Sequence, residues 1–249
     1  MDDVSRDSNA LVTQLNEETQ LFDIEISKEQ SQLLIAHLEL VIEKNKVLNL
    51  TRIVDEQDAV TKHVVDSLLF VKAYQGLAVP SGRFLDIGTG AGFPGIPFGI
   101  MTKLRGTLLD SVGKKVAAVE EFVSSLGLTD QLEPRTARVE DLARERHGQY
   151  VCVMARAVAE LNVLLEYAAP LLRKEGVLIV SKGQMSDTEL ANGTYAAKIC
   201  GMELVSRETF ELPHDAGHRE LVTYRKVAKS QIKLPRNVGM AKHKPLVVQ

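Results

Sequence analysis

The sequence has little cysteine and no long apolar run. Two cysteines in 249 residues, Cys152 and Cys200, cannot hold together a fold of this size, and both lie in apolar segments. Neither belongs to a CxxC pair, so we expect no metal site and two buried thiols in a reducing compartment. No apolar run approaches the roughly 18 residues that a membrane-spanning helix needs. The N-terminus also lacks the basic-then-apolar order of a signal peptide, so we expect a cytoplasmic protein without membrane contact.

Acidic residues are absent from the end of the chain. None follows Glu220, whereas residues 1–29 hold eight acidic residues and two basic ones. The basic residues after Glu220 are Arg225, Lys226, Lys229, Lys233, Arg236, Lys242 and Lys244. A basic tail on a protein with a net charge of -3 suits contact with a polyanion. A solvated, partly disordered tail over residues 229–249 explains the same composition equally well.

Helical patterns precede the first strand pattern. Residues 1–22 are acidic and polar without clear periodicity, and we expect them to be disordered. Ser27 and Gln30 have the spacing of a capping box, and apolar residues then recur at helical spacing up to about Asn45. A second helical stretch covers about residues 55–74. We therefore predict a helical annex over residues 23–78.

Short apolar strands alternate with helices over residues 79–228. Strand patterns occupy residues 83–88, 105–110, 149–155 and 176–183. Helical stretches occupy residues 114–126, 139–146, 159–173 and 186–199. This order predicts an α/β domain whose mostly parallel sheet has helices on both faces. The last two strand patterns, residues 201–210 and 218–227, have little between them, so we expect an antiparallel pair at that edge.

The most distinctive segment is FLDIGTGAGFPGIP, residues 84–97. The predicted strand ends at Asp86, and Gly88, Gly90 and two further glycines follow within eight residues, before prolines that open a helix. Glycines let the backbone approach a ligand closely and adopt positive φ. Because a plain strand-to-helix turn needs only one or two glycines, the segment predicts a loop that binds a nucleoside-containing cofactor.

Two cofactors suit this loop. Three of its glycines satisfy the G-x-G-x-x-G pattern, and Asp110 lies twenty residues past Gly90, as in NAD-binding proteins. Asp86 favours S-adenosylmethionine instead, because a carboxylate there can accept hydrogen bonds from a ligand ammonium or from loop amides. Pro94 removes an N–H that would otherwise bind pyrophosphate. The chain also offers no separate substrate domain with a hydride-transfer group, so S-adenosylmethionine is preferred and an NAD-dependent oxidoreductase is the alternative.

Other candidate site residues lie near the ends of core segments. Asp110 ends its strand where a carboxylate can accept both hydroxyls of a ribose, although it could instead cap the following helix. Arg138, Arg156 and Arg219 would converge on one rim of a parallel sheet, where guanidinium groups hold phosphates or stack on bases. Alternatively, these arginines are scattered over the surface. This alternative suits Arg156 least, because that residue follows an apolar strand. Asn49 follows a helix and could cap it, but its amide could also bind a guanine edge.

The chain resembles the bacterial family of 16S ribosomal RNA guanine-N7 methyltransferases, also called glucose-inhibited division protein B. The resemblance runs from about Asn45 to Leu246, in the family's order. It rests on NLT at 49–51, HVVDSL at 63–68, DIGTGAGFPGIP at 86–97, LLDSVGKK at 108–115, ARVED at 137–141, ARAVAEL at 155–161, KG at 182–183, HRELV at 218–222 and PRNVGMAKHKPL at 235–246. Lys115 and Ala155 stand where the family more often has arginine and serine.

The resemblance implies a class I, Rossmann-like, S-adenosylmethionine-dependent methyltransferase with a mostly parallel seven-stranded sheet. The residues implied around S-adenosylmethionine are Gly88, Phe93, Val139, Glu140 and Arg156. Those implied for RNA binding or catalysis are Asn49, Arg138, Arg156 and Arg219. The substrate is 16S ribosomal RNA or the small ribosomal subunit, and the family's target is guanine 527. We expect a monomer; a non-catalytic ribosome assembly factor with this fold is a further alternative.

The implied chemistry explains why no general base stands out in the sequence. Guanine N7 has an in-plane lone pair and no proton to lose, so catalysis requires alignment of the two reactants and preorganised electrostatics. His63 and Asp66 are three residues apart on a helix and could imitate a catalytic pair. We interpret them as packing and hydrogen-bonding residues between the annex and the core.

Overall fold

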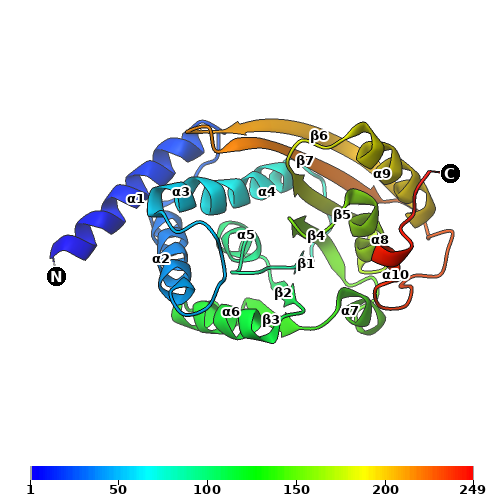
Figure 1. The fold of residues 1–249 in the computed structure, drawn as a ribbon, viewed down its shortest axis with the longest axis horizontal. Helices are drawn as coiled ribbons and strands as arrows, with labels where there is room; N and C mark the ends of the chain where they lie inside the picture. Colours follow the sequence, from blue (N-terminus) through cyan, green and yellow to red (C-terminus); the bar gives the residue numbers. More distant parts are fainter. Residues whose placement is uncertain (1, 249) are drawn as a thin grey trace.

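The computed structural model describes residues 2–248, which form helices around a seven-stranded sheet (Figure 1). The strand order is β3-β2-β1-β4-β5-β7-β6. The strands are β1 (Arg83–Ile87), β2 (Gly106–Asp110), β3 (Leu132–Thr136), β4 (Tyr150–Arg156), β5 (Leu172–Lys182), β6 (Met202–Leu212) and β7 (Gly217–Lys226). Strands β1 to β5 are parallel, whereas β7 is antiparallel to both β5 and β6. The predicted mostly parallel sheet and its antiparallel edge are confirmed.

Helices cover both faces of the sheet (Figure 1). One face carries α2 (Lys28–Asn45), α4 (Asp66–Gln75), α5 (Gly95–Thr102) and α6 (Gly113–Ser125). The other carries α7 (Val139–Glu145), α8 (Leu161–Ala168), α9 (Asp187–Cys200) and α10 (Met240–His243). Strand β5 shows why two cores form: Val177 and Ile179 point into the first, and Leu178 and Val180 into the second. This alternation follows from the two-residue period of a strand.

The predicted N-terminal annex is helical, and one segment of it departs from regular α-helix. Ser27 and Gln30 form the expected capping box of α2. The second predicted helix comprises α3 (Glu56–Ala59), a π-helical turn η1 (Val60–Val65) and α4. π-Helical turns are rare and occur often at functional sites. Here the turn carries His63 and directly precedes Asp66, so it positions both beside the sheet.

The expected disorder of residues 1–22 is not what the structure shows. Helix α1 (Asp2–Gln20) packs against α2 and η1. Leu11 and Leu15, one helical turn apart, are buried there, and so is Phe22. Buried Glu18 accepts a hydrogen bond of 2.9 Å from the Thr61 hydroxyl. Leu11 and Leu15 share one helical face, so few apolar residues suffice to order this segment despite its polar composition.

Two other elements differ from the sequence-based expectation. Strand β3, with the sequence LEPRT, matched no apolar pattern, because it is an edge strand with mostly half-exposed residues and a proline. Helix α8 ends at Ala168, within the predicted stretch 159–173, and β5 begins at Leu172. The start of β5 is charged and exposed, so its strand pattern is weak there.

The basic tail is part of the fold over residues 229–248. Arg236 Nε donates to Glu166 Oε1 at 2.7 Å, and this carboxylate is buried. Asn162 Nδ2 donates to the Leu246 carbonyl at 2.9 Å. The tail lies beside α8 and α9 in Figure 1, with α10 against α8. A solvated tail therefore does not describe these residues.

Candidate cofactor and substrate site

The glycine loop after β1 has the backbone geometry that its sequence predicts. Gly88, Gly90 and Gly92 have φ values of 72°, 59° and 93°, a region that favours glycine. A Cβ on Gly88 would lie 2.6 Å from Val158 Cγ2, so a side chain there has no room. The loop therefore leaves bare backbone at the carboxyl end of the sheet.

Asp86 holds this loop from beneath. Its side chain is fully buried, and Oδ2 accepts a hydrogen bond of 2.9 Å from the Gly95 N–H at the start of α5. Oδ1 is buried and has no hydrogen-bond partner among the described residues. Burial raises the pKa of Asp86 to about 6, although the Thr89 hydroxyl and the Gly95 N–H oppose this shift. Of the two roles expected for Asp86, the structure displays the contact with a loop amide.

Asp110 fixes the loop from the neighbouring strand. Its Oδ2 accepts from the Gly90 N–H at 3.1 Å, and its Oδ1 accepts from the Val112 N–H at 2.9 Å. Each carboxylate oxygen can accept a second hydrogen bond. The side chain is 8% exposed and lines a cavity, so it is open to a ligand hydroxyl.

That cavity, which we call the cofactor cavity, has a volume of about 250 Å³. Its lining is Ile87, Gly88, Leu109, Asp110, Ser111, Lys115, Ala137, Arg138, Val139, Glu140, Ala157, Val158, Tyr167 and Lys242. Gly88, Asp110, Val139 and Glu140, four of the residues expected to bind a cofactor, thus line one cavity. Gly90 and Asp86 support the loop instead of lining the cavity. Arg138, predicted to contact RNA, lies here at the start of α7 and is exposed.

The C-terminal tail forms one wall of the cofactor cavity. Glu140 is buried, and its Oε1 accepts a hydrogen bond of 2.8 Å from the Gly239 N–H. This contact places α10 so that Lys242 lines the cavity. Nothing in the sequence assigns Lys242, named above as a residue of the basic tail, to this cavity. The motif PRNVGMAKHKPL marked the tail as part of the family pattern, but its spacing does not show which surface it covers.

A second cavity lies beside the first and holds two of the predicted arginines. We call it the arginine cavity; its volume is about 410 Å³. Its lining is Lys62, His63, Asp66, Arg156, Ala157, Ser181, Lys182, Gly183 and Arg219. Ala157, which has a φ of 55°, lines both cavities. The two spaces are therefore neighbours across one residue at the end of β4.

Asp66 holds the two arginines in place. Its Oδ2 accepts from Arg156 Nη1 at 2.9 Å, and its Oδ1 accepts from Arg219 Nε at 3.0 Å. The side chains of Asp66, Arg156 and Arg219 are 4%, 14% and 21% exposed. Residues distant in the sequence thus form one partly buried cluster with a net positive charge. The expectation that Asp66 packs and hydrogen-bonds between annex and core agrees with these contacts, although nothing in the sequence pairs it with either arginine.

An aromatic stack forms the wall behind Arg156. The His63 ring stacks on Phe93, with centroids 4.9 Å apart and planes inclined by 12°, and Arg156 Cζ lies 5.7 Å from the Phe93 centroid. His37 packs against Phe93 as well, at 4.4 Å. Phe93, predicted to contact the cofactor, thus contacts residues of the arginine cavity and is itself buried.

Both histidines of this stack are neutral at neutral pH. Burial lowers the pKa of His63 to about 3, and the charge of Arg156 adds to the effect. Burial lowers the pKa of His37 to about 4, although the hydrogen bond between His37 and the Ala91 carbonyl raises it. His63 Nε2 is hydrogen-bonded to Thr51 Oγ1 at 2.8 Å. The expectation that His63 packs and hydrogen-bonds between annex and core agrees with these contacts.

Asn49 lies in neither cavity. It is exposed in the loop after α2. Asn45 holds this loop, because its Oδ1 accepts from the N–H groups of Leu50 and Thr51 at 2.8 and 3.0 Å. Among the predicted RNA-contacting residues, the structure therefore groups Arg156 with Arg219 and leaves Asn49 and Arg138 apart from them.

Comparisons with known proteins give one family. A model described as rRNA small subunit methyltransferase G matches residues 30–222. A protein of Desulfitobacterium hafniense named ribosomal RNA small subunit methyltransferase G is 37% identical over 231 residues, which cover 92% of this chain and 94% of that protein. Its namesake from Deinococcus radiodurans is 42% identical over 205 residues, which cover 81% of this chain and 80% of that protein.

Solved structures support the fold. Geranyl diphosphate methyltransferase in complex with SAM superposes with a TM-score of 0.54 at 11% identity, over 66% of this chain and 85% of that one. TYW2 of M. jannaschii in complex with AdoMet gives a TM-score of 0.51 at 15% identity, over 65% and 77%. The sheet and its flanking helices are thus those of class I, Rossmann-like methyltransferases.

Proposed function

Because the chain belongs to the rRNA small subunit methyltransferase G family, we propose that it transfers the methyl group of S-adenosylmethionine to guanine N7 in 16S ribosomal RNA. The observation that carries the site assignment is the Asp66–Arg156–Arg219 cluster, which borders the cofactor cavity at Ala157. A methyl donor in one cavity and a base in the other would meet there. The dinucleotide alternative has no support among these relatives.

The cofactor cavity would take the nucleoside part of S-adenosylmethionine. Gly88 offers bare backbone, and the Asp110 carboxylate is placed to accept the ribose hydroxyls. Val139 and Glu140 begin α7 at the cavity wall. When bound, S-adenosylmethionine supplies an electrophilic methyl group on a sulfonium.

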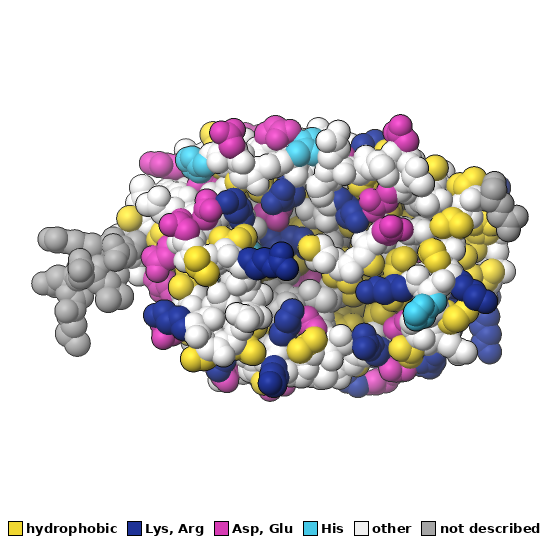
Figure 2. Space-filling model, viewed as in Figure 1, with side chains coloured by type: hydrophobic (Ala, Val, Ile, Leu, Met, Phe, Trp, Pro, Cys, Tyr) yellow, Lys and Arg dark blue, Asp and Glu magenta, His cyan; other side chains and the backbone are white. Residues whose placement is uncertain are grey.

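The arginine cavity would hold the guanine and its phosphates. Two planar guanidinium groups fixed by one carboxylate suit a base plane or a phosphate better than mobile lysines do. Lys62 and Lys182 also line this cavity, but each is paired with a carboxylate, Asp58 and Glu189 respectively. Figure 2 shows further Lys and Arg side chains spread across the middle of the face seen there, which suits a polyanion.

The residues of this site act by positioning. N7 needs no deprotonation, because its lone pair would form the new N–C bond and the electron pair of the broken bond would stay with the donor's sulfur. A general base works best with a pKa near the working pH. His63, with its pKa near 3, is neutral and bonded to Thr51, so it is not poised for that role. Arg156 and Arg219, both bonded to Asp66, would present held guanidinium groups to the base.

The test is to identify the methylated nucleoside. The purified protein is incubated with small subunits that lack the modification and with S-adenosylmethionine whose methyl group carries an isotopic label. The rRNA is then digested for mass spectrometry. We expect labelled 7-methylguanosine from the wild-type protein and from Arg105→Gln, an exposed control outside both cavities. Label in N2-methylguanosine, or in no nucleoside, would contradict the proposed reaction; the latter would favour an assembly factor.

Location and oligomeric state are further proposals. No described helix is long and apolar enough to cross a membrane. We propose a cytoplasmic monomer that meets its substrate on the ribosomal RNA or the small subunit. Light scattering during size-exclusion chromatography tests the oligomeric state, and a mass of twice 27.4 kDa would contradict it.

A further inference from the structure

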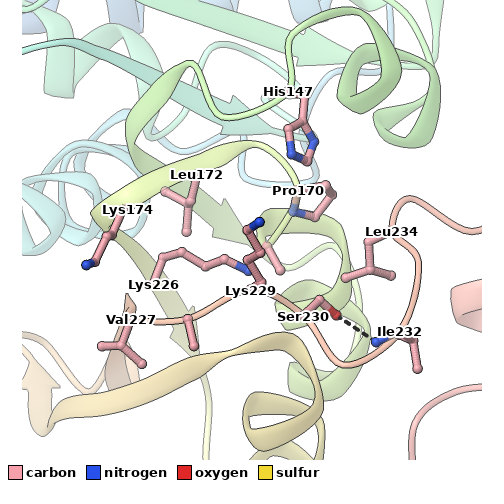
Figure 3. A pocket seen from close by; sticks show the side chains of 12 residues that line it. His147, Pro170, Leu172, Lys174, Lys226, Val227, Lys229, Ser230, Ile232 and Leu234 are labelled. Atoms are coloured by element: carbon pink, nitrogen blue, oxygen red, sulfur yellow. Dashed lines mark hydrogen bonds between the residues drawn. The ribbon is translucent and has the colours of Figure 1, made fainter.

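A third cavity, of about 550 Å³, lies at the opposite end of the sheet from the glycine loop (Figure 3). It is formed by the start of β5, the end of β7 and the tail that follows β7. Strand β5 runs from Leu172 in this cavity to Lys182 in the arginine cavity. At about 3.3 Å per residue, the two lie roughly 30 Å apart. This space, which we call the lysine cavity, is therefore not part of the methyl-transfer site.

The lysine cavity is lined by three lysines without acidic partners. His147, Lys174, Lys226 and Lys229 line it, and no acidic residue does. Figure 3 shows Lys226 lying across the pocket close to Lys229, with His147 on the opposite wall. Within the described chain, no carboxylate lies within 4.0 Å of any of the three lysine ammonium groups. The positive charge at this site is thus left for a ligand to neutralise.

Hydrogen bonds to the backbone hold Lys226 and the two residues after it. Lys226 is half-buried, and its Nζ donates to the Cys200 carbonyl at 2.7 Å. Directly after it, the N–H groups of Val227 and Ala228 donate to the Gly201 carbonyl at 3.0 and 3.1 Å. Burial lowers the pKa of Lys226, because it removes part of the stabilisation that water gives the ammonium charge. An anion would restore that stabilisation.

The remaining walls are apolar. Pro170, Leu172, Ile232 and Leu234 face the same space as the lysines. A volume of about 550 Å³ lies in the range of about 300–1,000 Å³ typical of small-molecule sites. The ligand therefore needs an apolar or planar part and an anionic part. A phosphate dianion matches several ammonium groups better than a single carboxylate does.

We infer that the lysine cavity binds a nucleoside phosphate, either a free nucleotide or one nucleotide of an RNA strand. The lysines would hold the phosphate, and the apolar wall would hold the base and sugar. This inference does not depend on the methyl-transfer assignment, because it uses none of the residues of the cofactor and arginine cavities.

The experiment is a calorimetric titration with GMP, guanosine and a single-stranded RNA hexamer. All proteins carry Arg219→Gln, so that binding in the arginine cavity is weakened. The test variant adds Lys174→Gln and Lys229→Gln, both exposed positions. The control adds Lys233→Gln, an exposed lysine of the same tail outside the cavity. S-Adenosylhomocysteine affinity, measured in parallel, should be equal in all three proteins.

We expect the double lysine change to weaken GMP or hexamer binding at least about tenfold, and the control change to leave it unaltered. Guanosine, which lacks the phosphate, should bind weakly to all. Dependence of GMP binding on the lysines would indicate a free nucleotide, whereas dependence of the hexamer alone would indicate RNA, with a flatter salt dependence in the variant. Equal affinities in test and control proteins would overturn the inference, as would tighter lysine-dependent binding of laurate than of GMP.

Discussion

The two ends of strand β5 hold their positive charges in different ways. At the carboxyl end, buried Asp66 fixes Arg156 and Arg219, and buried Asp86 and Glu140 hold the adjoining loop and tail. At the amino end, three lysines line a cavity without any carboxylate. A buried carboxylate fixes the orientation of a guanidinium group, whereas an ammonium group without a carboxylate leaves its charge for a ligand to neutralise. The first end therefore suits chemistry and the second suits retention of an anion.

Removing Asp66 should have the largest effect. Asp66→Ala leaves two half-buried guanidinium groups without their carboxylate, which costs about 3–5 kcal/mol of unfolding free energy when one partner of a buried pair is lost. We expect methyl transfer to slow at least about 100-fold, with S-adenosylhomocysteine affinity altered much less. Urea denaturation and single-turnover assays measure the two effects. Asp66→Asn, which keeps one oxygen acceptor, should recover part of both; a wild-type rate in Asp66→Ala would show that the arginines need no anchor.

A side chain in the glycine loop should have the next largest effect, a loss of donor affinity. Gly88→Val combines a positive φ with a Cβ 2.6 Å from Val158, inside the cofactor cavity, so donor affinity should fall by about 100-fold. Gly127→Val is the matched control, because Gly127 has a φ of 68° but open space around it. Calorimetry with S-adenosylhomocysteine compares them. Equal loss in both variants would mean that backbone strain alone, and not occupied ligand space, is responsible.

We expect the ionisation of Asp86 to make the free energy of unfolding depend on pH. Its folded-state pKa of about 6 exceeds its ordinary value of 3.8, so its contribution to stability is present below about pH 4 and is lost as the pH rises through about 6. Asp86→Asn cannot ionise but can still accept from Gly95. Relative to the wild type, the variant should gain roughly 2 kcal/mol of unfolding free energy between pH 4 and pH 7. Urea denaturation at the two pH values measures this, and parallel pH curves would contradict the shift.

Releasing the tail from Glu140 should have the smallest effect, a modest loss of donor affinity. Glu140→Ala removes the acceptor of the Gly239 N–H, which lets α10 and Lys242 move away from the cofactor cavity. We expect donor affinity to fall by about three- to tenfold. Asp141→Ala, at an exposed neighbouring position, is the control. If both variants bind S-adenosylhomocysteine like the wild type, the tail is a structural element that does not contribute to donor binding.

Features of the fold and the site that depend on residues close together in the sequence were predictable. The glycine loop, Asp110 at the end of a strand and the cap at Ser27 each follow from residues a few positions apart, so they were recognisable. Contacts between distant residues were not. Neither the pairing of Asp66 with two arginines nor the covering of the cofactor cavity by Lys242 leaves a periodic signal.

Weak patterns failed for a related reason. Strand β3 is a half-exposed edge with a proline, so it lacks the apolar run of a central strand. Helix α1 is ordered by Leu11 and Leu15, two apolar residues in a polar segment. In both cases tertiary packing decides the structure where local composition does not.

The central claim is that methyl transfer takes place where Arg219 and Arg156 are held beside the cofactor cavity. The most direct test is the single-turnover rate constant for methylation of small subunits, at saturating donor and substrate, in Arg219→Gln and in Lys174→Gln/Lys229→Gln. We predict at least about a 100-fold lower rate constant for the arginine variant and a wild-type rate constant for the lysine variant. A wild-type rate constant in Arg219→Gln would contradict the assignment of the site.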